Sequence, residues 1–170
     1  SSTLSGNTAT TGGGIVNVSL VGGTGTTTLS NTILANQPST NIFNDSGTVV
    51  SEGYNLANDG AGGFLVAAGD MFNTGAKLDV AGLQDNGGPT STIALQSDSM
   101  AVDHGNPAAP GTGPATCPTP DQRLFVRPAD GPDGDSTATC DIGAFEPGAS
   151  PPAGTATPTV TRTPTATGTP

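Results

Sequence analysis

The chain has 170 residues, of which 14 are acidic and 4 are basic, giving a formal net charge of −10 at pH 7. This balance argues against a nucleic-acid partner, because a nucleic-acid binder needs a basic face to neutralise phosphates. No stretch approaches the roughly 18 consecutive apolar residues of a membrane span, so no span is predicted. Apolar residues make up only 32% of the chain, and 26 glycines and 15 prolines indicate frequent turns.

Short β-branched and aliphatic runs recur between clusters of Gly, Asn, Asp and Ser. We expect strands at residues 14–18, 26–29, 47–50 and 63–66. Runs this short, separated by turn residues, are typical of β-structure, and the helical spacing of apolar residues is missing. The sequence therefore predicts an all-β protein with a thin core built by stacking.

The first 40 residues contain a weak repeat. Leu4 and Ile33 are separated by 29 residues, and so are Asn7 and Asn36. A period of about 20–30 residues with one set of short strands per repeat favours a solenoid. Asparagines at equivalent turns would then hydrogen-bond along the stack. A β-sandwich is the alternative, although no Asn-Gly hairpin turn precedes residue 86.

Two later segments have the residues of tight turns. Asn86, Gly87 and Gly88 supply positive-φ positions for a sharp corner between two turns of the solenoid, and Asp85 would accept hydrogen bonds from the amides of that corner. Asp103 follows a small apolar strand, and we expect a partly buried carboxylate that caps a turn. For all five residues we predict a structural role.

Two of the four basic residues fall close to three carboxylates in the last segment before the tail. Arg123 and Arg127 lie near Asp121, Asp141 and Glu146 in sequence. Because a guanidinium matches a carboxylate with two parallel hydrogen bonds, we expect at least one bidentate pair in this terminal unit. Arg123, Arg127 and Glu146 are accordingly predicted to be structural.

The two cysteines, Cys117 and Cys140, have neither the spacing nor the histidine partners of a zinc site. A disulfide between them would close a loop of about 24 residues and stabilise the fold by roughly 3–4 kcal/mol. Two unpaired buried thiols are the alternative. A disulfide in a lysine-poor, Thr/Ser-rich chain indicates an oxidising, extracellular location.

Acidic residues gather in the loop between the cysteines and directly after it. Asp130, Asp133, Asp135 and Asp141 lie close together in sequence and form a candidate calcium site, because hard cations prefer carboxylate oxygens. The spacing does not fit an EF-hand, and an ordinary solvated loop is the favoured interpretation. No other cofactor is predicted.

Residues 148–170 form a separate Thr/Pro-rich extended tail after a domain that spans residues 1–147. One interpretation is a polyproline-like spacer with O-glycosylated threonines. The other is an edge strand that pairs with a neighbouring subunit, because alternating threonines point their amides to one side and the prolines lack donors only on the opposite side. The threonines are Thr155, Thr157, Thr159, Thr161, Thr163, Thr165, Thr167 and Thr169.

A set of motifs over residues 2–146 resembles a family of bacterial surface proteins. The motifs are "SGNTATTGGGI", "TLSNTILAN", "EGYNLANDG", "LQDNGGPTSTIALQSDSMAVDHGNPA", "DQRLFVRP" and "CDIGAFE". Their order is similar to that in choice-of-anchor Q domain proteins, which often also carry the CSLREA motif. The resemblance implies a secreted, right-handed parallel β-helix that ends at "CDIGAFE", and it implies no activity. This chain departs from the pattern in having His104 after Asp103 and a Thr/Pro tail without a visible anchor.

These features together predict a non-catalytic extracellular structural protein, either on a cell surface or in a self-assembling filament. A homo-oligomer that grows head to tail is expected because a β-helix exposes unpaired strand edges at its ends. Cell-wall or glycan contacts are also expected. The chain begins at Ser1 without Met, and we expect it to be processed or cut from a longer protein.

The alternative is a surface adhesin or carbohydrate-binding module. A polysaccharide-degrading enzyme is less well supported. Lys77 is the only lysine, there is no Trp, and Tyr54 is the only tyrosine, so few residues are available for a lyase base or for stacking on sugars.

Overall fold

The computed structural model describes residues 1–19, 23–35 and 40–154, and this part is mostly β-structure without an α-helix. One 3-10 helix, η1 (Ala61–Gly63), is present, and no helix in the described ranges is long and apolar enough to cross a membrane. The all-β prediction is confirmed. The strands are β1 (Ser2–Ser5), β2 (Ile15–Val18), β3 (Thr26–Leu29), β4 (Thr32–Ala35), β5 (Ile42–Asp45), β6 (Thr48–Ser51) and β7 (Leu56–Ala57).

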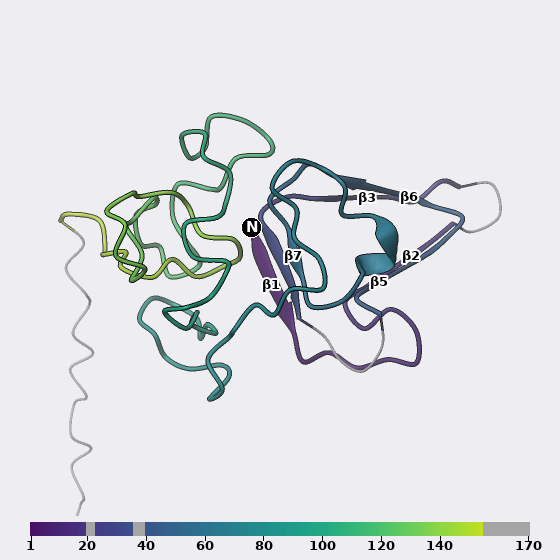
Figure 1. The fold of residues 1–170 in the computed structure, drawn as a ribbon, viewed down its shortest axis with the longest axis horizontal. Coiled ribbons are helices and arrows are strands. Elements are labelled where there is room, and N and C mark those ends of the chain that lie inside the picture. Colours follow the sequence, from purple (N-terminus) through teal and green to yellow (C-terminus); the bar gives the residue numbers. More distant parts are fainter. Residues whose placement is uncertain (20–22, 36–39, 155–170) are drawn as a thin grey trace, which may run out of the picture.

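All strand pairs are parallel, and each strand pairs with the one three places later in the chain. The resulting sheets are β1-β4-β7, β2-β5 and β3-β6. In Figure 1 they form the three sides of a roughly triangular outline. An isolated parallel bridge from Leu56 to Met71 continues the first sheet by one residue pair. The predicted parallel pairing is therefore confirmed.

The pairing register differs by one residue from the repeat expected from the sequence. Leu4 pairs with Leu34, and Ile33 pairs with Thr3. A shift of one residue moves a side chain to the other face of a strand. The predicted equivalence of Leu4 and Ile33 is therefore wrong: Leu4 and Leu34 share the inner face, whereas Ile33 points the opposite way.

Strand β4 is buried on both faces because apolar residues cover each side. Inside the triangle, Leu34 packs with a cluster formed by Leu29, Ile42, Ala57, Ala61 and Leu65. On the other face, Ile33 packs with a cluster formed by Leu56, Ala76, Ala101 and Ile142. The second cluster joins the strands to the irregular C-terminal region, which lies on the far side of β1, β4 and β7 in Figure 1.

Asparagines do lie one above the other, but not the expected pair. Asn17 and Asn44 are in register in β2 and β5. The Nδ2 group of Asn17 donates to the carbonyls of Gly25 (3.3 Å) and Thr48 (3.0 Å), and that of Asn44 donates to Gly47 (2.8 Å). The amides thus satisfy backbone carbonyls at the next corner of the triangle. Asn36 of the predicted pair lies outside the described residues.

Three of the four strands expected from local sequence are present, as β2, β3 and β6. The expected strand at 63–66 is wrong. Gly62 and Gly63 adopt positive φ angles of 64° and 80°, which are incompatible with extended backbone, and no strand follows them. Leu65 still enters the core, while Val66 is 84% exposed.

Replacing Ile33 with alanine should lower the free energy of unfolding by about 2–5 kcal/mol, because the change leaves a cavity between β4 and the C-terminal region. Chemical denaturation monitored by circular dichroism measures this loss. Val80→Ala is the matched control, since Val80 is 94% exposed and its truncation should cost less than about 0.5 kcal/mol. Equal stability of the two variants would contradict the burial described here.

Candidate functional site

The irregular C-terminal region, residues 76–154, is called the covering region below. Its backbone amides hydrogen-bond to the outer face of the first sheet. Ile142 N donates to Ala101 O (2.9 Å), Gly143 N donates to Asn31 O (3.0 Å), and Ala144 N donates to Thr3 Oγ1 (3.1 Å). Gly143 has a φ of 102°, and a Cβ there would lie 2.7 Å from Ile33 Cδ1. The "CDIGAFE" segment, at which the resemblance implies that the β-helix ends, therefore lies along the side of the strands.

Asn31, between β3 and β4, holds the loop that leads to the disulfide. It is fully buried and adopts a φ of 46°. Its Nδ2 donates to Ala115 O (2.7 Å), and its Oδ1 accepts from Asn106 N (2.7 Å). Sequence analysis missed this residue, because Asn31 is one of three consecutive polar residues between Leu29 and Ile33 and nothing local distinguishes it.

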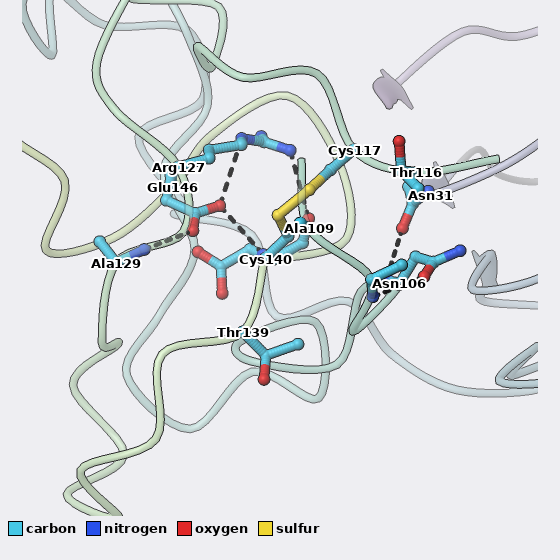
Figure 2. Close-up of a disulfide and its surroundings, with 12 residues drawn as sticks. Asn31, Asn106, Ala109, Thr116, Cys117, Arg127, Ala129, Thr139, Cys140 and Glu146 are labelled. Carbon is cyan, nitrogen blue, oxygen red and sulfur yellow. Dashed lines mark hydrogen bonds and ion pairs between the residues drawn. A yellow bond between two sulfur atoms is a disulfide. The ribbon is translucent and has the colours of Figure 1, made fainter. Parts of the chain in front are cut away.

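The structure confirms the predicted disulfide between Cys117 and Cys140, which are 23 residues apart, with Cα atoms separated by 6.5 Å. Both residues are buried, and Gly105 N donates to Cys140 O (2.7 Å). Figure 2 shows the bridge next to Arg127 and Glu146 on one side and Asn106 on the other. The disulfide thus lies among the polar groups of the covering region, away from the acidic tip of its own loop.

Arg123 is buried between two aromatic rings and a carboxylate. Its guanidinium lies 3.8 Å from the ring centre of Phe145 and 4.4 Å from that of Phe125. Nε and Nη2 both donate to Asp121 Oδ2, at 2.9 Å and 2.7 Å, and Nη2 also donates to Glu146 O. The side chain therefore joins three segments of the covering region through a charge-assisted pair and cation–π contacts.

Arg127 and Glu146 form a second buried ion pair, with Nε 3.2 Å from Oε2 (Figure 2). Glu146 also accepts from the backbone amides of Ala129 and Asp141, both at 2.9 Å, and Arg127 donates to Gly143 O (2.8 Å). Burial lowers the pKa of Arg127 and raises the pKa of Glu146. Both arginines and Glu146 thus occupy interior positions that link backbone segments.

Asp141 lies in the same interior and has no arginine of its own. It is fully buried; its Oδ1 accepts from Asp103 N (2.7 Å), and its Oδ2 has no hydrogen-bond partner within the described structure. Burial, together with repulsion from Glu146, raises the pKa of Asp141 to about 9. Both effects favour the protonated, neutral form of Asp141.

The acidic loop gathers a different set of carboxylates from the one predicted. Asp103, Asp130 and Asp133 each place an oxygen within 4.8 Å of the others. Asp141 faces the interior and does not join them, and Asp135 is near enough to raise the pKa of Asp103 by repulsion, after the larger effect of burial. Calcium at this group stays a prediction.

Asp103 itself ties the two ends of the acidic loop together. Its Oδ2 accepts from Gly131 N (3.0 Å) and its Oδ1 from Thr139 N (2.8 Å). We expected the Asp103 carboxylate to cap one turn. It instead accepts from two amides at opposite ends of the acidic loop.

The segment around Asp85 is a hairpin tip. Asp85 Oδ1 accepts from Gly87 N (3.1 Å), and Gly87 and Gly88 have φ angles of 87° and 84°. Gln84 and Thr92 pair in antiparallel fashion on either side of the tip. A corner between two parallel turns of a solenoid was therefore the wrong expectation here. Asn86 Nδ2 closes the hairpin by donating to Thr92 O (3.0 Å).

A shallow cleft of about 360 Å³ contains the only tyrosine and the only histidine of the chain, Tyr54 and His104. The Tyr54 ring lies against Gly69, where it leaves no room for a Cβ. His104 Nδ1 is 2.6 Å from Val102 O. Asp103 also lines the cleft, so an aromatic ring, an imidazole and a carboxylate share one concave surface.

Strand edges at one end of the three sheets have no partner in the described part of the chain. β1 is the first strand of its sheet, and β2 and β3 are each paired on one side only. Such edges present unpaired N–H and C=O groups that can bind another strand. All eight predicted glycosylation threonines, Thr155–Thr169, lie outside the described residues, as does most of the predicted tail, residues 148–170.

No family model, curated protein or solved structure was found to match this chain.

Removing the disulfide by Cys117→Ser should lower the free energy of unfolding by about 3 kcal/mol, because the unfolded chain regains the freedom of the closed loop. Denaturant titration under non-reducing conditions measures the change. The double variant Cys117→Ser/Cys140→Ser is the control for effects of the unpaired thiol that Cys117→Ser leaves at Cys140. Two free thiols per unfolded wild-type chain without reductant would contradict the bridge.

The raised pKa of Asp141 should make stability fall as the pH rises. The folded state binds a proton that the unfolded state releases near its ordinary pKa of about 4, so the contribution of Asp141 to stability is greatest at low pH and is lost as the pH rises toward 9. Asp141→Asn keeps an acceptor for Asp103 N and places a neutral amide where Oδ2 is unpartnered. Thermal unfolding between pH 5 and 9 should show a flatter profile for Asp141→Asn than for wild type. Asp98→Asn, at an exposed position, should retain the wild-type slope; identical slopes in all three proteins would contradict the assignment.

Proposed function

We propose that this chain is a non-catalytic, extracellular structural protein, built as the terminal part of a right-handed parallel β-helix and joined to other copies at a bacterial surface or in a filament. The observation that carries the proposal is the parallel pairing of every third strand, in which the outer edges of β1, β2 and β3 have no partner among the described residues. Parallel strands that recur every third element fit one helical turn of backbone for each set of three strands. Crossovers between parallel strands are right-handed in about 98% of proteins, which supports the handedness.

The covering region supports the structural role. Its buried polar side chains hold backbone segments together: Asp121 binds Arg123, and Glu146 binds Arg127 and two amides. Each of these carboxylates therefore already has partners that position the chain. A general acid or nucleophile would instead need an oxygen directed at a substrate.

The disulfide supports an extracellular location. Bridges of this kind persist mainly in oxidising compartments. The resemblance to bacterial surface proteins noted in the sequence agrees with this location.

A carbohydrate-binding surface module is the second candidate, and the cleft at Tyr54 and His104 favours it. Sugar rings bind aromatic faces and hydrogen-bond to carboxylates and imidazoles, and all three groups meet there. Saturable binding of a soluble oligosaccharide that Tyr54→Ala abolishes would favour this candidate over self-assembly.

Self-assembly is tested on the full chain by closing the open edges with proline. In β1, β2 and β3 the amides of Ser5, Val16 and Thr28 face the unpaired side, because Gly6 N, Ile15 N and Leu29 O bond within the sheets. Ser5→Pro/Val16→Pro/Thr28→Pro removes these donors without removing a ladder bond. We expect wild type to grow in mass with concentration, as measured by light scattering and electron microscopy, and the proline variant to remain monomeric.

Ser5→Thr/Val16→Thr/Thr28→Val is the matched control, since it changes the same positions and keeps all three N–H groups. The control should assemble like wild type, with the same circular dichroism as the proline variant. A wild-type chain that stays monomeric at every concentration would overturn the proposed function.

A further inference from the structure

The cleft that contains the only tyrosine and the only histidine is built from residues with unusual backbone geometry. Tyr54 and Asp103, which both line it, adopt positive φ angles of 57° and 51°. A side chain of this size seldom adopts such a conformation, which persists only where the surrounding structure enforces it. Gly69 and Gly105 complete the wall, since a Cβ on Gly69 would clash with the Tyr54 ring and one on Gly105 would clash with Cys140 O. The fold therefore fixes the shape of the cleft.

The aromatic wall of the cleft is held in place by the turn below it. Tyr54 N donates to Ala68 O (3.0 Å), and the ring lies against Gly69. Asp70 fixes the turn that carries Gly69, since its Oδ2 accepts from Ala67 N (2.8 Å) and its N–H donates to Ala67 O (3.2 Å). The ring is thus positioned in advance, and a ligand that packs on it orders little of the protein.

The polar groups of the cleft offer mainly hydrogen-bond acceptors. His104 Nδ1 lies 2.6 Å from Val102 O. Because a carbonyl only accepts, Nδ1 carries the proton of the neutral ring, and Nε2 is left as an acceptor. Each oxygen of Asp103 accepts one backbone N–H and keeps a second acceptor position. A ligand rich in N–H or O–H donors matches these groups.

The cleft also has a negative charge at one side. Oxygens of Asp103, Asp130 and Asp133 lie within 4.8 Å of one another. Burial raises the pKa of Asp103, and repulsion from Asp133 and Asp135 raises it further, so a cation bound beside Asp103 would relieve that repulsion. Among the described residues, those that line the cleft include neither Lys nor Arg. A cationic ligand is therefore favoured over an anionic one.

The remaining lining is apolar. Met71 and Pro107 extend the surface next to the Tyr54 ring. The C–H groups on one face of a sugar ring are apolar and pack on an aromatic face, and an ammonium group is attracted to the same face. The volume of about 360 Å³ is near the lower end of the range of small-ligand sites, roughly 300–1,000 Å³. The cleft thus suits a small, ring-shaped ligand with a positive charge.

We propose that this cleft binds an amino sugar, with the sugar ring on Tyr54 and the protonated amine directed at Asp103 and His104. The inference rests on the second candidate function, whose ligand it names, and it does not require self-assembly. A neutral sugar would use the aromatic face but would leave the charge of Asp103 unmatched. An ammonium group supplies three N–H donors and a positive charge, and its hydrogen bonds to a carboxylate are charge-assisted.

The test titrates the full chain with two soluble oligosaccharides of equal length, a glucosamine oligomer and its N-acetylated form, in buffer with a metal chelator. Tyr54 is the only tyrosine, Trp is absent and His104 is the only histidine, so tyrosine fluorescence and the histidine ring protons in NMR report on this cleft. We expect saturable changes in both signals with the amine form. The acetylated form should bind about tenfold more weakly or less, because acetylation removes the charge and leaves one N–H donor.

Variants measured by calorimetry separate the parts of the site. Tyr54→Ala should abolish binding, whereas Tyr54→Phe keeps the ring and should bind nearly as tightly as wild type. Asp133→Asn removes an exposed charge beside Asp103 and should weaken binding of the amine form severalfold, with little effect on the acetylated form. Asp98→Asn is the matched control, since it removes an exposed charge from a residue that does not line the cleft, and it should bind like wild type. Circular dichroism checks that each variant is folded.

Three results would overturn the inference. Equal affinity for the two oligosaccharides would exclude recognition of the amine and leave the carbohydrate-binding candidate standing. Unchanged Tyr54 and His104 signals with both oligosaccharides would overturn the inference and that candidate together, while the proposed structural role is unaffected. Undiminished binding of the amine form by folded Tyr54→Ala would place the ligand outside this cleft.

Discussion

Strand β4 lies between two apolar clusters, and the fold depends on this double burial. Leu34 faces the inside of the triangle, and Ile33 faces the covering region, each with no exposed surface. Three small sheets of four-residue strands have little core of their own, because a short strand buries only one or two large side chains on each face. The irregular C-terminal region supplies the missing apolar contacts through Ile142 and Ala101. It is therefore part of the same folding unit as the strands, although it contains no strand itself.

The covering region has few backbone ladders, so side chains take over the task of satisfying its buried polar groups. Asn31 binds the loop before the disulfide, Arg123 and Arg127 bind carbonyls and carboxylates, and Asp103 holds both ends of the acidic loop. Buried charges of this kind are costly to leave unpaired, so each arginine is matched by an acid. Asp141 has no third arginine, and neutralisation by a proton is the remaining way to bury its carboxyl group.

The same construction leaves strand edges open, and this connects the fold to the proposed role. The covering region lies along the side of the first sheet, so the outer edge of β1 has no strand partner among the described residues, and a cavity lies beside Thr3. The backbone groups on that edge are the ones that the proposed assembly would use.

Local sequence was sufficient for several features. β-branched runs between glycines and asparagines predicted an all-β chain and the positions of β2, β3 and β6, because strand propensity and turn chemistry act over a few residues. The two cysteines, without zinc-ligand spacing, predicted their own pairing. The cluster of Arg123, Arg127 and Glu146 could be expected in the last segment before the tail, because these residues are close in sequence.

Only the tertiary structure decided the register, the inward turn of Asp141 and the place of the covering region. A one-residue shift between Leu4 and its partner is almost invisible in a sequence of alternating small residues, yet it exchanges the two faces of β4. Asp141 looks like its acidic neighbours until Ile142 and Cys140, on either side of it, are fixed in the interior and carry it inward. Asn31 reads as one turn residue among many, and its partners at Asn106 and Ala115 are more than 70 residues away. Contacts over such distances depend on how the whole chain packs, which no local pattern records.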